Sequence, residues 1–431
     1  MAALKDLEAG HEPHISEHTT NNKENGENTS VSSTAHQEIG LPSKWFRRML
    51  DAGVEENGIL PVPPEQRTQT QPSNLFTVFF TCLLCILPLP TGALGTTVYG
   101  LGLRDVSLII IFFNILTCIP PAIISIGGCK TGMRQMIQAR YSFGLYLGII
   151  PILLNAGTVT GFTLVGSIVS GQAIAAVNGK ANISVNVGIG IVCTLSFCLA
   201  LKIFTFVYLG LLTPSTPLLI LGAAIGGAIP NNESWQIAWD RYGTGGVMAE
   251  MLAPAGGFGK FVLVILALSV VGNMVLSNYS VALCLQMLIP VFAKVPRFFF
   301  IMATLAIMIP MSIYAAAQWE ESLGNFLAVI SYWAGCFDAI VIEELIVFRS
   351  TDYSSYDPQI WNQAQRLPTG LAAIGASLVS LGLVVPSMDT PWFTGPIGER
   401  IGDLGFETAF VVTGIAYYPL RTLEARLMGH V

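Results

Sequence analysis

Apolar segments of about 20 residues recur along the chain from Asn74 onward, and they restrict what it can fold into. A segment of that length is what an α-helix needs to cross about 30 Å of hydrocarbon. The predicted limits of these spans are 74–100, 106–127, 146–177, 186–201, 203–229, 256–290, 297–317, 325–348, 368–386 and 406–420. The sequence therefore predicts an all-α polytopic membrane protein with about ten transmembrane helices.

The composition agrees with a membrane protein. Hydrophobic residues make up 52% of the 431 residues and charged residues only 11%, against about 25% charged residues in an ordinary soluble domain. The net charge is −6 and no basic patch with interleaved aromatic residues occurs, so nucleic acid is not expected as a partner. The lipid bilayer is the expected environment, and the sequence leaves the oligomeric state open.

Histidine and cysteine are placed where they favour neither metal nor redox chemistry. All five histidines lie in the polar tails, which removes histidine as a proton relay or metal ligand within the bilayer. Most of the eight cysteines lie in apolar segments, and packing explains the CxxC pair of Cys82 and Cys85 better than metal binding does. No glycine-rich phosphate loop or Ser-His-Asp set occurs, so we predict no metal, no cofactor and no enzyme.

Polarity divides the chain into three regions. Residues 1–72 are predicted to form a cytosolic tail that is largely disordered, with a short basic amphipathic segment at 43–50. Residues 73–420 form the membrane domain, and residues 421–431 form a short second tail. No secretory signal pattern precedes the first span, which is therefore expected to act as the insertion signal.

Lysine and arginine collect in alternate loops, which predicts the orientation in the membrane. With a cytosolic N-terminus, the inner loops hold Lys130, Arg134, Arg140, Lys202, Lys294, Arg297, Arg349 and Arg366. The positive-inside rule then places both termini in the cytosol. The glycosylation sequon at Asn182 falls outside, close to the membrane.

Helix-breaking residues interrupt the first span in the stretch ILPLPTGALG, which contains Pro88, Pro90, Gly92 and Gly95. Backbone groups freed by these residues cannot face lipid, because each unsatisfied group there costs several kcal/mol. Transporters use such discontinuous helices to hold substrate or ion near the middle of the bilayer. We predict a broken helix whose unwound backbone at 88–92 contributes to a binding site; a simple proline kink is the alternative.

Polar residues also occur in the middle of the sixth span, in the stretch VVGNMVLSNYS at 270–280. Amide and hydroxyl groups at that depth need partners or a water-filled interior. Asn273 and Ser277 are four residues apart, so they share one face of a helix. We predict a second interruption here.

Acidic residues lie in the stretch SYWAGCFDAIVIEELIVFR at 331–349. Asp338 is near the middle of a predicted span, and with no histidine available it is the leading candidate for a proton-titrating group. Its alternative role is that of a structural partner for a neighbouring hydroxyl or amide. Glu343 and Glu344 are expected at the membrane interface, paired with Arg349.

Several longer motifs carry a resemblance to a known family. They include GALGTTVYGLGLRD, KTGMRQMIQARYSFG, YWAGCFDAIVIEELIVFR and WFTGPIGERIGDLGFETAFVVTGIAYYPLRTLE, in colinear order between Val54 and Glu424. In these motifs the chain resembles the fungal purine-cytosine permeases of the nucleobase-cation symporter family. The resemblance implies an inverted-repeat, leucine-transporter-like bundle in the plasma membrane. It also implies secondary active import of purine bases and cytosine with a co-transported cation, expected to be a proton.

The chain departs from the family pattern after the fourth span. Its end, LSFCLA, runs directly into LKIFTFVYLG, which resembles the start of the family's seventh span. The family's fifth and sixth spans are therefore missing, a loss of roughly 60 to 70 residues, which is enough for two crossings. The resemblance accordingly implies an incomplete bundle.

The resemblance also implies the residues of a substrate site. Phe162 and Gly166 stand where the family has a Trp and an Asn, so a stacking ring remains but an amide is lost. Asn273 matches a family Asn, Ser277 is a polar replacement, and Thr81 stands where the family has a Ser. The aromatic platform of the family's sixth span has no counterpart here.

Two alternatives to base transport stay open. The abrupt join at Ala200–Leu201 is consistent with a truncated or mis-spliced member of the family that does not transport. A carrier of a related heteroaromatic compound, such as a vitamin B6 vitamer, is also compatible with the motifs.

Overall fold

A computed structural model describes residues 59–63, 67, 79–80, 82–177, 184–200, 212–289, 291–390 and 392–428 of the chain. Several sequence predictions fall outside these residues. They concern the tail up to residue 58 with its basic segment at 43–50, Thr81, the Asn182 sequon, the Leu201 side of the join and residues 429–431.

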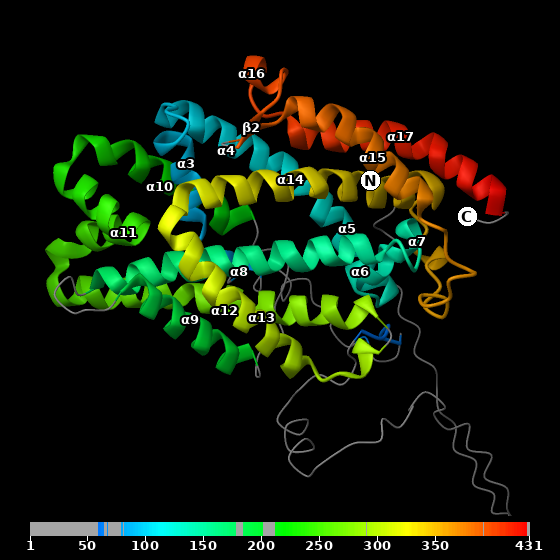
Figure 1. The fold of residues 1–431 in the computed structure, drawn as a ribbon, viewed down its shortest axis with the longest axis horizontal. Helices are drawn as coiled ribbons and strands as arrows, with labels where there is room; N and C mark the ends of the chain where they lie inside the picture. Colours follow the sequence, from blue (N-terminus) through cyan, green and yellow to red (C-terminus); the bar gives the residue numbers. More distant parts are fainter. Residues whose placement is uncertain are drawn as a thin grey trace, which may run out of the picture. The chain divides into compact units, whose positions relative to one another are not determined.

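The described chain is almost entirely helical (Figure 1). The α-helices are α3 (Pro88–Thr97), α4 (Leu103–Thr117), α5 (Ile119–Thr131), α6 (Gln135–Gln138), α7 (Arg140–Phe143), α8 (Ile149–Val177), α9 (Val185–Ala200), α10 (Leu212–Ala228), α11 (Glu233–Leu252), α12 (Gly256–Leu288), α13 (Arg297–Ala315), α14 (Trp319–Glu343), α15 (Leu371–Ser387), α16 (Gly398–Ile401) and α17 (Gly405–Met428). Short 3-10 turns are η2 (Ile229–Asn231), η3 (Ala253–Ala255), η4 (Phe292–Lys294), η5 (Ala316–Gln318) and η7 (Tyr353–Ser355), and a π-helical turn, η6 (Glu344–Phe348), continues α14. The strands β1 (Asp389–Thr390) and β2 (Phe393–Thr394) form a small antiparallel pair.

Every predicted span contains helix in the described residues, and the all-α membrane fold class is confirmed. Five helical segments of the described chain are long and apolar enough to cross a membrane: Leu103–Thr131, Ile149–Val177, Glu233–Leu288, Arg297–Gln318 and Glu321–Phe348. The count of about ten spans stays a prediction.

The helix α11 was not predicted, because its sequence is too polar for a span. Asn232 caps its first turn by accepting a hydrogen bond from the backbone N–H of Ser234 at 3.2 Å. The helix is kinked at Tyr242 and Gly243, and Gly243 has a φ of 56°, which favours glycine. The cap and the acidic Glu233 after it were the available sequence signals for this helix.

Packing is densest where α8 and α12 lie along each other, and α14 lies between α8 and the α15–α17 pair (Figure 1). One buried cluster joins the start of α3 to the α8–α12 pair and to α13; its members include Ile86, Leu89, Ile168, Val270 and Met308. The first span is thereby anchored to the most extensively packed helices of the protein.

Two glycines allow α3 and α10 to approach closely. A Cβ atom on Gly92 would collide with the carbonyl oxygen of Leu219, and one on Gly222 would collide with that of Leu89. Inside a membrane, close backbone packing of this kind holds helices together, because lipid tails are as apolar as the side chains. Gly92 therefore serves helix packing.

The substitution Gly92→Ala should destabilise the protein, because the added methyl group fits only if two backbones separate. We expect a loss of about 1–3 kcal/mol, as in overpacked cores, measured as a lower melting temperature of the purified protein in detergent. Gly157→Ala on α8 is the matched control, because a Cβ atom there meets nothing within 4 Å. Equal melting temperatures for the two variants would contradict this role of Gly92.

Candidate functional site

The first span is interrupted at Leu84–Leu87. Residues 79–80 and 82–83 are helical, the next four residues form a bend and a turn, and α3 begins at Pro88. The predicted unwound backbone at 88–92 is therefore wrong: this stretch is helical, and the interruption lies just before it. Proline is well suited to a first helical turn, because its missing N–H would have had no partner there.

The other residues assigned to unwound backbone also lie within α3. Pro90 is in the first turn, and Gly95 faces α4, since a Cβ atom there would lie 2.7 Å from Val106 Cγ1. The prolines thus define where the second half of the span starts, and the glycines set how closely its neighbours pack.

Asn273 supplies a hydrogen-bond donor to the interrupted backbone. Its Nδ2 atom donates to the carbonyl oxygen of Cys82 at 3.2 Å. In an unbroken helix this carbonyl would accept from the N–H four residues later, Ile86. The side chain from α12 thus replaces a bond that the interruption removes.

The second predicted interruption, at 270–280, is wrong. The helix α12 runs without a break from Gly256 to Leu288. Asn273 and Ser277 keep their backbone N–H groups in the helix, so their polar side chains do not break it. Ser277 is partly buried one turn beyond Asn273 on α12.

Gly166 and Phe162 lie one turn apart on α8, close to the interruption. A Cβ atom on Gly166 would lie 2.7 Å from Val270 Cγ1 and 4.0 Å from Leu87 Cδ1. The absence of a side chain at Gly166 lets α12 and the interrupted segment approach α8. The ring of Phe162 meets the ring of Phe326 edge-on, with centroids 5.2 Å apart and planes at 83°.

Asp338 lies on α14 and is partly buried, whereas its neighbours in sequence, Phe337 and Ala339, are buried. One turn earlier, Gly335 packs against Phe406 and Ala409 of α17. The interruption contacts α8 and α12, and Phe162 of α8 contacts Phe326 in the N-terminal half of α14. Asp338 takes part in none of these contacts.

A crevice of about 340 Å³ opens beside the interrupted span, between α3, α4 and α14. Its lining is mostly apolar and includes Leu94, Val106 and Leu327. Asp403 at its edge accepts hydrogen bonds from the hydroxyl of Tyr332 and, at 2.8 Å, from the N–H of Gly405.

Sequence reasoning missed a buried polar network at the other end of α14. Glu344 is fully buried, and its two carboxylate oxygens accept from Arg421 Nε at 3.0 Å and Nη2 at 3.1 Å, and from the Tyr417 hydroxyl at 2.9 Å. The predicted pair with Arg349 is present, with Nε 3.2 Å from Glu344 Oε1. Glu344 lies in the protein interior, where two guanidinium groups neutralise it. Its predicted position at the membrane interface stays a prediction.

Loops that were predicted to be cytosolic meet at this same end. Arg140 donates to the carbonyl oxygen of Met287 at 2.9 Å, and the Tyr141 hydroxyl donates to that of Asp357. Burial lowers the pKa of Arg140 to about 10 and raises the pKa of Tyr141 to about 12, so at neutral pH the first is charged and the second is not. The sidedness of this end stays a prediction.

Replacing Asn273 by leucine should remove the donor to Cys82 O while keeping the branched shape of the side chain. We expect a loss of about 1–2 kcal/mol, the size of an interhelical hydrogen bond in a membrane or of one unsatisfied buried acceptor. Thermal unfolding of the purified protein measures it. Gly272→Ala is the control, because a Cβ atom at this neighbouring position meets nothing within 4 Å; a leucine variant as stable as the control would contradict the assignment.

Comparison with known proteins identifies relatives of the chain. Residues 61–207 match a family model described as a permease for cytosine/purines, uracil, thiamine and allantoin. The purine-cytosine permease fcyB of Emericella nidulans is 27% identical over 511 aligned positions that cover 100% of each chain. The purine-cytosine permease FCY22 of Saccharomyces cerevisiae is 29% identical, with 90% of each chain covered, and the vitamin B6 transporter TPN1 of the same yeast is 22% identical, with 89% of this chain and 90% of the relative covered.

A solved structure supports the fold. It is that of Mhp1, a nucleobase-cation-symport-1 family transporter, in a closed conformation with bromovinylhydantoin bound. The two chains superpose with a TM-score of 0.56 at 14% sequence identity, covering 86% of this chain and 96% of the other. The predicted inverted-repeat helical bundle is confirmed by this likeness.

The alignment with the Emericella relative is longer than this chain. It extends over 511 positions, whereas the chain has 431 residues, so about 80 aligned positions have no residue of this chain opposite them. This difference agrees with the predicted loss of two crossings. Which crossings are absent stays a prediction.

Proposed function

Because the chain belongs to the permease family for cytosine and purines, uracil, thiamine and allantoin, we propose that it imports purine bases and cytosine by secondary active transport. As a member of this family it is a transporter and not an enzyme. The proposed location is the plasma membrane, with both termini in the cytosol. The proposed driving force is a co-transported proton.

The interrupted first span is the observation that carries the proposal. It lies beside α8 and α12, where Asn273 reaches its backbone and Gly166 allows close approach. Irregular backbone within a membrane span leaves N–H and C=O groups without helical partners, and such groups can pair with the polar edges of a base. The ring of Phe162, one turn from Gly166, can stack on the face of the base. Ser277 and Thr81 are proposed to add hydroxyl groups to this site.

Uptake of radiolabelled adenine, hypoxanthine and cytosine tests the proposal, in yeast cells that lack their own purine-cytosine permeases. We expect saturable uptake that unlabelled bases compete away and that a proton uncoupler abolishes. The control is the same strain with an empty vector, with protein at the cell surface verified by a C-terminal tag. Surface-localised protein without saturable uptake of any base would overturn the proposal.

Asp338 is proposed as the group that couples transport to protons. Burying a carboxylate within a membrane span costs free energy, so such residues usually have a function, and no histidine occurs in the predicted spans. Asp338→Asn removes the titration while keeping the shape, so uptake should no longer rise as the external pH falls. The control is Glu399→Gln, which changes an exposed carboxylate outside the spans. Unchanged pH dependence in the Asp338 variant would remove this residue from the coupling mechanism.

A second candidate function is favoured by the length of the chain. About 80 aligned positions of the Emericella relative have no counterpart here, so the chain is also compatible with an incomplete member of the family that does not transport. Sequencing the transcript across the codons for Ala200 and Leu201 discriminates between the two. An intervening coding segment with two apolar runs would identify this chain as an incomplete product.

The vitamin B6 transporter among the relatives makes B6 vitamers an alternative class of substrate. Their rings are flat and heteroaromatic, as those of the bases are, so stacking alone does not separate the two classes. Competition of labelled adenine uptake by pyridoxine measures the preference. Stronger competition by pyridoxine than by unlabelled adenine would replace the bases as the proposed substrates.

A further inference from the structure

We propose that Phe326 of α14 is a specificity-determining residue that provides a second aromatic face for the substrate, opposite Phe162 of α8. This inference rests on the proposed function, because it concerns the same site. It identifies a side chain that neither the motifs nor the family resemblance singled out. The ligand class that it selects is a flat, uncharged heteroaromatic ring.

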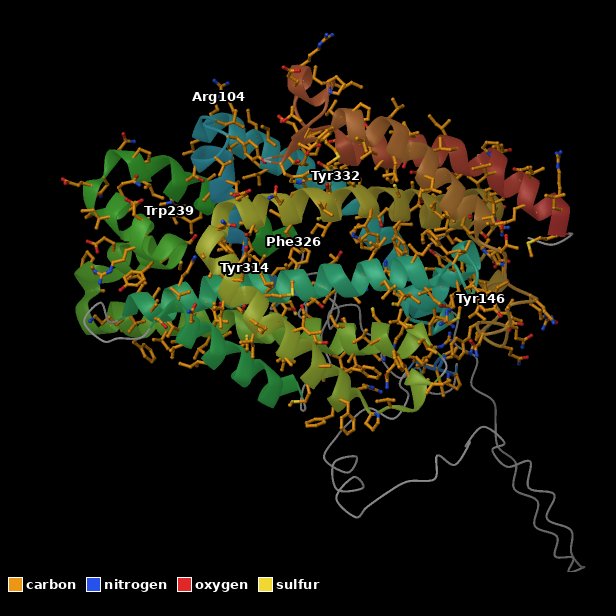
Figure 2. The ribbon with its side chains drawn as sticks, viewed as in Figure 1. Arg104, Tyr146, Trp239, Tyr314, Phe326 and Tyr332 are labelled. Carbon is orange, nitrogen blue, oxygen red and sulfur yellow. The ribbon has the colours of Figure 1, made fainter. Side chains whose placement is uncertain are left out.

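Direct contact between the two rings is the first reason. Phe326 extends from α14 into the space between α14 and α8, as Figure 2 shows, and its ring meets Phe162 edge-on with centroids 5.2 Å apart. Gly161 is part of the same arrangement, because a Cβ atom there would collide with the Phe326 ring. The sequence Gly161–Phe162 therefore provides one ring on α8 and leaves room beside it for a second from α14.

The location of Phe326 is the second reason. Leu94 of α3, Val165 of α8 and Leu323 of α14 form a buried cluster, and Phe326 packs against it together with Leu87. Leu87 is the last residue of the interrupted segment. The aromatic pair and the irregular backbone are thus parts of one contiguous environment.

A crevice close to Phe326 is the third reason. The crevice of about 340 Å³ between α3, α4 and α14 is lined by Leu94 and Leu327. Both leucines also belong to the cluster around Phe326, with Leu94 buried in it and Leu327 packed against it. The crevice and the surroundings of Phe326 therefore share two apolar side chains, Leu94 and Leu327.

The geometry of stacking predicts how the pair binds its ligand. A flat ring held on both faces needs about 3.5 Å on each side, so the two phenylalanine rings would stand about 7 Å apart with a base between them. The present edge-on contact is closer, at 5.2 Å between centroids. The two planes are also nearly perpendicular, at 83°. Binding therefore requires both rotation of a ring, to bring the faces parallel, and a separation of the two rings by about 2 Å. Since neither ring carries a polar atom, the pair selects for flatness and leaves the choice among bases to hydrogen bonds elsewhere.

Equilibrium binding of radiolabelled adenine to the purified full-length protein tests the inference, alongside uptake in cells. Phe326→Leu keeps apolar bulk and removes the aromatic face, so we expect Kd and KM for adenine to rise about tenfold, the loss of one stacked ring. Phe326→Tyr keeps the face and should restore wild-type values. Gly161→Ala displaces Phe326 without deleting it and should raise Kd in the same direction. Phe112→Ala is the matched control, because Phe112 is 63% exposed on α4, and its values should equal those of the wild type.

The outcomes separate this inference from the proposed function. If Phe162→Leu weakens adenine binding while Phe326→Leu and Gly161→Ala bind as the wild type does, the role of Phe326 is overturned and the proposed function stands. If Phe326→Tyr fails to restore the binding that Phe326→Leu loses, the aromatic face is not what matters and the inference is also overturned. If the wild-type protein binds and takes up no base, the proposed function fails and this inference fails with it. Thermal unfolding of each purified variant verifies that it is folded before binding is measured.

Discussion

A backbone carbonyl at bilayer depth has no water from which to accept a hydrogen bond, and the bond from Asn273 Nδ2 to Cys82 O at 3.2 Å meets that need where the first span is interrupted. Without a partner, such a group costs several kcal/mol in hydrocarbon. The irregular segment can therefore exist only with α12 beside it. The close packing of α8 on α12 serves the same requirement. Because Gly166 has no side chain, Val270 of α12 and Leu87 of the interrupted segment can both pack against α8.

The two ends of α14 have different kinds of contact. Near its start, Phe326 and Leu323 meet α8 and α3 through apolar contacts that carry no directional bonds. At its end, Glu344 is held by two guanidinium groups and a phenol in a buried network that ties α14 to α17. Breaking a buried charge network is costly, whereas apolar contacts can slide or repack. A base that enters between α8 and α14 would therefore displace the N-terminal half of α14 more easily than its C-terminal end.

Sequence patterns located the helices better than they located the site. The length of the apolar segments correctly predicted helix in every span, because a chain that crosses lipid must pair its backbone N–H and C=O groups internally. The prolines correctly indicated an interruption in the first span. The predicted unwound segment began at Pro88, whereas the interruption ends at Leu87 and Pro88 starts the next helix. Asn273 was correctly singled out as a polar group needing a partner, yet the partner is a carbonyl 191 residues away in sequence, which no local pattern reveals.

Other features left no usable signal in the sequence. Glu344 and Arg421 are separated by 77 residues, and only the packing of α14 on α17 brings them together. Phe326 looks like one apolar residue among many in its span, and its significance comes from the glycine opposite it on α8. Long-range contacts of this kind depend on how helices pack, and the spacing of residues along one helix does not contain that information.

The proposed function requires that the interruption at Leu84–Leu87, together with the aromatic residues beside it, receives a flat base. A cryo-electron microscopy map of the full chain in lipid nanodiscs with adenine would show this directly. We expect density for one base against Phe162, next to a first span that is non-helical at residues 84–87. A continuous helix through those residues, or adenine bound elsewhere while the Phe162–Phe326 contact stays closed, would contradict it.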